Sequence, residues 1–336
     1  MIQLSAASET GGCGKLNEYE ISYGKMRVPV YRIFARPLKG VMPVPESPFL
    51  GRENCLFAAE VDIEVFGDEF LPAYTVGDNA MVVATDSMKN IIIRQALDFA
   101  GCTIEGYLQA IGAHFIANYV QVHDIRLAVR ELPFPPALVP DGDGGFVESK
   151  DLHLGSGRTD YATARLDMRR VNGASRIVSH ESGRIGMKLF KITGSAFTSF
   201  VRDEYTTLPD RRDRPLYIFL DVYWTYNDVN DAFAEHPHRY VPAEQVHDIC
   251  ATVFAEFVSE SIQHLVHEIG KRLLERFPQL AEIRFSAQNR TRDPFHASED
   301  NPEVKVYSDP FPAYGTITLR LTRAAHVVEE PMQWDG

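Results

Sequence analysis

The order of two hydrophobic patterns constrains the fold of this chain more than any other feature of its sequence. Residues 19–36 and 55–67 are rich in β-branched and aromatic side chains, and the second run alternates apolar with acidic residues. This pattern predicts two strands of a sheet with one solvated face. Apolar residues then recur at helical spacing in 86–99 and, after Gly101, in 103–115, which predicts a pair of amphipathic helices.

The same order of elements returns further along the chain. Strands are expected over 122–133, 162–193 and 215–226, helices over 242–257 and 259–276, and strands over 281–287, 303–308 and 315–322. Each half of the chain is therefore ββααββ. Two such halves, with helices on one face of an antiparallel sheet, make an α+β protein with an internal structural repeat.

The repeat predicts a division of the chain and an oligomer. The expected units are a flexible leader over 1–18, domains over 19–183 and 184–325, and a tail over 326–336. One sheet face stays uncovered by helices, and the sheet has two open edges, which favour pairing with other chains. Closure of the sheet into a barrel with other subunits would cover both.

Composition excludes several classes of function. The formal net charge of −12 disfavours a broad surface for nucleic acid or an anionic membrane. No apolar stretch approaches the ~18 residues that a membrane helix needs, and the first 20 residues lack the pattern of a signal peptide. The four cysteines form no CxxC pair, and the chain ends without an S-K-L peroxisomal signal. A cytoplasmic protein with reduced thiols is expected.

The sequence contains no persuasive metal or cofactor motif. His264 and His267 lie three residues apart on a predicted helix beside Glu268, but this is not the HExxH pattern of a zinc site. Residues 141–145 resemble a calcium loop only superficially and are predicted to form a turn. The phosphate-binding and dinucleotide-binding glycine motifs are missing, as is GxSxG. Neither a metal nor an organic cofactor is expected.

The segment 74–90, YTVGDNAMVVATDSMKN, is the most distinctive part of the sequence. Residues 81–84 are expected to form a strand that delivers Thr85 and Asp86 to the start of a helix. The unpaired N–H groups and the positive end of the dipole at a helix N-terminus suit an anion or a carbonyl oxygen. Alternatively, Asp86 or Ser87 only caps the helix.

This segment closely resembles the signature of the urate oxidase (uricase) family, and further matches follow in family order over about 20–322. They are Tyr23-Gly24-Lys25, IGAHFI over 111–116, FTSFVRDEYTTL over 197–208 with Asp213-Arg214, Ser261-Ile262-Gln263, and SAQN over 286–289. The resemblance implies a tandem tunnelling fold that assembles into a homotetrameric barrel with active sites between subunits. It implies cofactor-independent oxidation of urate by dioxygen to 5-hydroxyisourate and hydrogen peroxide.

The resemblance also assigns roles to residues, divided between two neighbouring chains. One chain supplies Lys25 and Thr85, which match the family's proton relay, and Asp86, whose backbone N–H contacts the bound purine. A lysine beside other cations, or partly desolvated, has its pKa lowered toward that of a useful base.

The neighbouring chain supplies the groups that hold the purine ring. Phe197 matches the residue on which the ring stacks, and Arg214 matches the arginine that binds one edge of the ring through its planar fork of donors. Gln263 matches the glutamine on the other edge, and Ile262 acts through its backbone. Asn289 matches the asparagine that, with the threonine hydroxyl, holds water or dioxygen above the ring.

One departure concerns the family's relay histidine. The family reads N-x-H where this chain has Asn289-Arg290-Thr291. A threonine hydroxyl can pass a proton but has no pKa near 7, and His296 could substitute only if the loop folds back. The substrate is therefore urate or a close relative such as 8-oxoguanine. Arg214 can only donate hydrogen bonds, which favours a carbonyl on that edge and hence urate.

Two further functions stay open at this point. A tunnelling-fold protein could act on pterins or purines by hydrolysis or deamination, although the lack of a metal-ligand set weakens that alternative. The chain could also be a purine-binding pseudoenzyme that lost turnover with the histidine. Such a protein would bind a purine without consuming oxygen.

Overall fold

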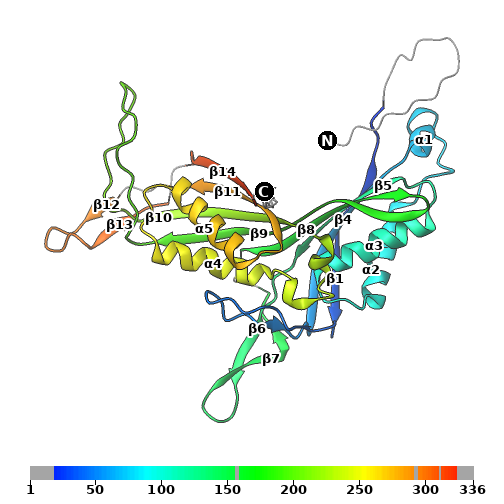
Figure 1. Ribbon diagram of the computed structural model, residues 1–336, viewed down its shortest axis with the longest axis horizontal. Helices are drawn as coiled ribbons and strands as arrows, with labels where there is room; N and C mark the ends of the chain where they lie inside the picture. The colour runs from blue at the N-terminus through cyan, green and yellow to red at the C-terminus, as the bar shows by residue number, and fades with distance from the viewer. Residues whose placement is uncertain (1–18, 156–158, 291–293, 310–311, 324–336) are drawn as a thin grey trace, which may run out of the picture.

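The computed structural model describes residues 19–155, 159–290, 294–309 and 312–323. Eight strands form one sheet in which every neighbouring pair is antiparallel. In spatial order the strands are β1 (Tyr23–Ile33), β4 (Leu56–Phe66), β5 (Asp124–Glu131), β8 (Tyr161–Val171), β9 (Ala174–Lys191), β10 (Leu216–Tyr226), β11 (Leu280–Asn289) and β14 (Gly315–Thr322). The curved sheet runs the length of the molecule (Figure 1).

Four helices cover one face of this sheet (Figure 1). They are α2 (Thr85–Asp98), α3 (Ile104–Asn118), α4 (Ala243–Glu256) and α5 (Ile262–Arg276). The first pair packs on β1, β5, β8 and β9, and the second pair on β9, β11 and β14. The element order is therefore ββααββ twice, as the sequence predicts, and the α+β class is confirmed.

Alternating burial along the strands explains why the helices pack on one face only. In β10 every second residue, from Leu216 to Tyr226, is buried, and the residues between them are partly exposed. The buried residues meet apolar side chains of the helices, such as Ile111 and Ile269, in one continuous core. Each buried aliphatic side chain of this kind contributes roughly 1.5–3 kcal/mol.

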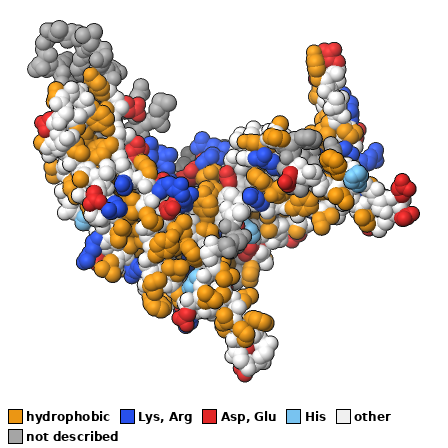
Figure 2. Space-filling model, turned by 180° about the vertical axis from the view of Figure 1, so that it is seen from behind, with side chains coloured by type: hydrophobic (Ala, Val, Ile, Leu, Met, Phe, Trp, Pro, Cys, Tyr) orange, Lys and Arg blue, Asp and Glu red, His pale blue; other side chains and the backbone are white. Residues whose placement is uncertain are grey.

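The opposite face of the sheet is charged, and its charges are paired across strands. Arg126 of β5 donates to Asp167 of β8 at 3.0 Å, and Arg284 of β11 donates to Glu181 of β9 at 2.8 Å. Figure 2 shows basic and acidic side chains together in the hollow between the two projecting ends of the molecule. This face is therefore a solvated surface, as the sequence alternation predicts.

Several short segments lie outside the main sheet and its four covering helices. A short helix, α1 (Leu71–Thr75), precedes α2, and β2 (Leu38–Lys39) pairs with β3 (Gly51–Arg52). Two hairpins lie outside the main sheet: β6 (Pro136–Pro140) with β7 (Phe146–His153), and β12 (Pro294–Ala297) with β13 (Lys305–Tyr307). Short 3-10 turns occupy Asp68–Phe70, Val229–Phe233 and Pro237–Arg239.

The structure corrects three local predictions. Residues 81–84, expected to form a strand, are irregular, and the Pro/Gly-rich stretch 133–145, expected to consist of turns, contains strand β6 and the turn that leads into β7. Ala84, not Asp86 or Ser87, occupies the N-cap of α2. Thr103 is the N-cap of α3, because its hydroxyl accepts from the Gly106 N–H at 3.1 Å.

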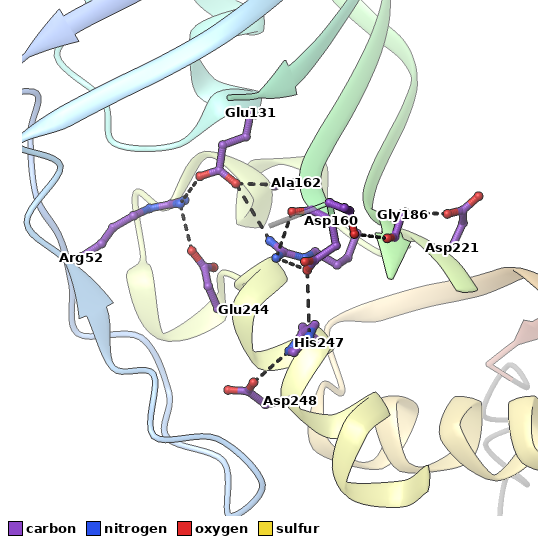
Figure 3. Close-up of polar contacts among 11 residues, drawn as sticks. Arg52, Glu131, Asp160, Ala162, Gly186, Asp221, Glu244, His247 and Asp248 are labelled. Carbon is purple, nitrogen blue, oxygen red and sulfur yellow. Dashed lines mark hydrogen bonds and ion pairs between the residues drawn. The ribbon is translucent and has the colours of Figure 1, made fainter. Parts of the chain in front are cut away.

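The two repeats are joined by a partly buried polar network (Figure 3). Arg52 donates to Glu131, at the end of β5, at 3.1 Å and to Glu244, in the first turn of α4, at 3.0 Å. Arg184 of β9 is fully buried and forms an ion pair with Asp160. The expected division at residue 183 falls inside β9, which runs unbroken through both repeats, and separate domains stay a prediction.

Candidate active site

Two polar clusters contain the candidate site residues that the structure describes. The first cluster lies where β1 meets the start of α2. Gly24 approaches the neighbouring strand so closely that an added Cβ would lie 1.9 Å from the Ile63 carbonyl oxygen, and only glycine fits. The regular pairing of β1 with β4 then breaks after Lys25, whose side chain is half-buried.

Tyr23 joins the irregular segment before α2 to this strand. Its hydroxyl accepts a hydrogen bond from the Val83 N–H at 2.7 Å, and its ring meets that of Phe70 edge-on at 5.0 Å. Burial raises the pKa of Tyr23, so the hydroxyl stays protonated. Thr85, the first residue of α2, is exposed two residues after this contact.

Asp86 brings charge to the same place. Its exposed carboxylate accepts from Lys89 at 2.6 Å and from Asn90 at 3.0 Å. The hydrogen bond and charge of Lys89 lower the pKa of Asp86, and the charge of Lys25 lowers it further. The charge of Lys25 therefore acts on Asp86 at the start of α2, and the catalytic roles of both residues stay predictions.

The second cluster follows β9. Phe197 exchanges two backbone hydrogen bonds with Arg211, at 2.7 and 3.0 Å. Its ring stacks on Phe200, with centroids 4.9 Å apart and planes 10° from parallel, and the Arg214 guanidinium lies 5.5 Å from its centroid. The Phe197 ring therefore contacts both a second aromatic ring and a planar cation.

Asp213 fixes this pair to the end of β9. Its carboxylate accepts from the Gly194 N–H at 2.7 Å and from the Thr193 hydroxyl at 2.8 Å. These hydrogen bonds lower the pKa of Asp213. Because Asp213 directly precedes Arg214, the same contacts hold the arginine beside the segment that leads to Phe197.

The start of α5 is held against the same segment. Ser195 forms a bridge with Ser259; their hydroxyls lie 3.1 Å apart, and the Ala196 N–H donates to the Ser259 carbonyl at 2.8 Å. Three residues later α5 begins with Ile262, which is buried, followed by Gln263, which is exposed. Phe197, Arg214 and Gln263 therefore share one end of the sheet.

Asn289 lies at that end as well. It is the last residue of β11, opposite Ile218 of β10 and Gly315 of β14. Thr291 lies outside the described residues. His296, the alternative relay residue, is exposed in β12, where it is the cross-strand partner of Val306 in β13.

The two clusters lie at opposite ends of the sheet. Successive cross-strand partners lead from Lys25 in β1 to His180 in β9. From 180 to the end of β9 at Lys191 the strand extends roughly 35 Å, at about 3.3 Å per residue, and Phe197 lies beyond it. In Figure 1 the first cluster lies near α1 and the second near β12 and β13. One chain does not bring them together.

One cavity of the described chain lies apart from both clusters. It has a volume of about 320 Å³, adjoins the network of Arg52 and Glu244 and is lined by none of the site residues predicted from the sequence. The part of the chain that the structure describes contains no group of three or more His, Cys, Asp and Glu side chains able to hold a metal ion. Among the same residues, no helix is long and apolar enough to cross a membrane.

The sequence analysis gave no role to two residues that hold these clusters in place, Tyr23 and Asp213. Tyr23 and Asp213 lie next to predicted site residues, so their positions in the motifs could have pointed to them.

Two ββααββ repeats on one antiparallel sheet, with helices on a single face, define a tandem tunnelling-fold protein. A crystal structure of the urate oxidase of Bacillus sp. TB-90 matches this one with a TM-score of 0.87 and 42% sequence identity, covering 90% of this chain and 100% of that chain. The uricase structure from Bacillus fastidious matches with a TM-score of 0.86 and 40% identity, over 91% of this chain and 94% of that one.

Sequence comparison agrees with the structural likeness. A family model described as Uricase matches residues 180–318. The uricase of Haloferax volcanii is 47% identical over 271 residues, which is 81% of this chain and 88% of that protein. The uric acid degradation bifunctional protein of Bacillus sp. TB-90 is 42% identical over 96% of this chain, which spans 64% of that longer protein. The chain belongs to the uricase family.

Proposed function

We propose that this protein oxidises urate with dioxygen and water to 5-hydroxyisourate and hydrogen peroxide. The observation that carries the proposal is the pairing of Phe197 with Arg214, 5.5 Å apart, in a chain that is 47% identical to a uricase. A purine anion stacked on the ring of Phe197 places one edge within reach of the guanidinium. The Gln263 amide binds the opposite edge, because it can donate to one ring atom and accept from the next.

Residues of the first cluster, at the start of α2, carry out the proton transfers. Lys25 accepts a proton from the bound purine, with the hydroxyl of Thr85 beside it in the relay. The resulting electron-rich anion gives two electrons to dioxygen, which leaves as hydrogen peroxide after taking up two protons. Water adds to the oxidised ring and supplies the new hydroxyl group. Asn289 holds dioxygen, and then water, above the ring.

The active site combines two chains. The distance between Lys25 and Phe197 within one chain supports this arrangement, because the sheet separates them by more than the size of a purine. We infer a homotetrameric barrel, in which the uncovered, ion-paired sheet face lines the interior and the edge strands β1 and β14 pair with neighbouring chains.

The direct test of the activity uses purified, metal-free protein with urate and, separately, with 8-oxoguanine. Loss of ultraviolet absorbance and production of hydrogen peroxide report turnover. We expect one peroxide for each urate consumed and little reaction of 8-oxoguanine, whose amino group would face the donors of Arg214. Binding of urate without oxygen consumption would indicate a pseudoenzyme instead.

The Thr291→His variant tests the proton relay. An imidazole has a pKa near 6.5, which a threonine hydroxyl cannot supply. Urate turnover is expected to rise in the variant, with the largest gain near neutral pH. An unchanged pH profile of kcat would show that the relay runs through other groups.

A further inference from the structure

Lys191, the last residue of β9, makes an unusual set of contacts for a partly exposed lysine. Its ammonium group donates to the carbonyl oxygens of Phe254, Ala255 and Phe257, at 2.8, 3.2 and 3.0 Å. The last carbonyls of a helix have no partner within the helix, and a cation there also meets the negative end of the helix dipole. All three ammonium donors are therefore engaged at the C-terminus of α4.

The same side chain lies against the loop that carries the stacking ring. A Cβ added to Gly194 would lie 3.2 Å from Cε of Lys191 and 3.3 Å from its Nζ. Gly194 has a φ of +79°, which favours glycine, and its N–H donates to Asp213. Lys191 thus contacts the segment between β9 and Phe197 as well as the end of α4.

These two contacts lie on the two segments that frame the candidate purine pocket. The carbonyls bound by Lys191 directly precede Ser259, which Ser195 holds in place, and α5 begins at Ile262 shortly after. A shift of the end of α4 would therefore move Gln263 relative to the ring of Phe197.

We propose that Lys191 is a positioning residue for the purine pocket, setting the distance between the stacking ring and the amide that binds the ring edge. This inference rests on the proposed function. The competing explanation is that Lys191 only caps α4, in which case its loss would lower stability without changing affinity for the purine.

The test compares Lys191→Met with wild type, using Lys188→Met on the same strand as the matched control. Lys188 lies 5.3 Å from the centroid of the Phe219 ring. Urate binding is measured without oxygen, and kcat and KM are measured in air. In K191M we expect Kd and KM to rise about tenfold while kcat changes less than about threefold, because an interaction common to ground and transition states is lost. K188M should match wild type.

A conservative variant tests whether the hydrogen bonds of Lys191 are needed for affinity, and the comparison of Kd with thermal midpoint separates positioning from capping. K191R keeps several donors for the same carbonyls and is expected to restore most of the affinity. If K191M does not fold, K191Q replaces it, since its shorter amide cannot span three carbonyls and a severalfold rise in Kd is expected. A folded K191M or K191Q with wild-type Kd and a lower thermal midpoint would overturn the inference. Failure of wild type to consume urate would instead overturn the proposed function.

Discussion

Arg214 is the residue on which the choice of substrate depends most. Its backbone N–H donates to Ser195 at 2.9 Å, and Asp213 anchors the residue before it, so the guanidinium is presented in a fixed position beside Phe197. A planar fork of donors recognises adjacent oxygen and nitrogen acceptors, and its charge stabilises the urate anion.

Truncation of this residue is expected to abolish most of the activity. Hydrogen bonds to charged groups contribute about 1.5–3 kcal/mol, so Arg214→Ala should lower kcat/KM for urate by about 100-fold. Steady-state kinetics checks this, with Arg212→Ala, an exposed neighbour, as the control. Full activity in R214A would refute the assigned orientation of the purine.

At the scale of elements, the irregular segment before α2 is held to β1 by the hydroxyl of Tyr23. Removing the hydroxyl in Tyr23→Phe leaves the Val83 N–H without its acceptor, which costs about 1–3 kcal/mol when such a group is buried. Thr85 then loses its fixed position relative to Lys25. We expect kcat to fall by about three- to tenfold while the anaerobic Kd for urate stays unchanged.

The control for this variant is Tyr74→Phe. The Tyr74 hydroxyl donates to the Ser22 carbonyl at 2.8 Å in an exposed position, and its removal should leave kcat near the wild-type value. Equal loss of kcat in both variants would show that the effect is a general loosening of β1.

α3 begins with a buried acid that makes stability depend on pH. Burial raises the pKa of Glu105 from its ordinary 4.5 to about 7, although the Ser182 hydroxyl donates to it at 2.7 Å. The folded protein holds the proton that the unfolded chain releases, so this residue lowers stability progressively as pH rises from 4.5 to about 7.

The Glu105→Gln variant should remove this loss. Relative to wild type, its free energy of unfolding should improve between pH 5 and pH 8, on the order of 3 kcal/mol. Thermal midpoints of both proteins across that range provide the measurement. A constant difference between the two midpoints would show that Glu105 does not titrate there.

The sequence predicts the elements well where hydrophobic period is strong. In β4 and β10 alternate residues are buried, and in α2 to α5 the residues at helical spacing are buried. These buried faces pack against one another, so the predicted elements form. The strand expected over 81–84 is wrong, because its β-branched residues imitate a strand although Val83 bonds to a side chain instead of a neighbouring strand. The β6–β7 hairpin was missed because its prolines are typical of loops.

The candidate site follows from the sequence only in part. Arg214 lies over the ring of Phe197, and the charge of Lys25 acts on Asp86, whereas the roles of these residues in the site stay predictions. The contacts of Lys191 could not be predicted, because they join residues far apart in the sequence. Buried polar pairs such as Arg184 with Asp160 leave no periodic signal either.

For the whole molecule, the separation of the clusters predicts that two inactive variants complement each other. Lys25→Met and Arg214→Ala disable different halves of each site, so a mixed assembly contains some sites with both halves intact. Random mixing should restore roughly a quarter of wild-type activity. The two proteins are dissociated together, reassembled and assayed for urate consumption.

The control is the mixture of the same two proteins without prior dissociation, which should stay inactive if exchange is slow. Light scattering checks that the reassembled particles have the mass of a tetramer. No recovery of activity in particles of that mass would mean that each site draws on one chain alone.

The distance between the two ends of the sheet has a consequence for how this protein is handled. Because neither end of the sheet forms a complete site, specific activity should depend on protein concentration. Progressive dilution should lower the turnover per milligram as the oligomer dissociates, and concentrating the protein should restore it. Assays run at nanomolar enzyme would then underreport what the same molecules do in a crowded cell.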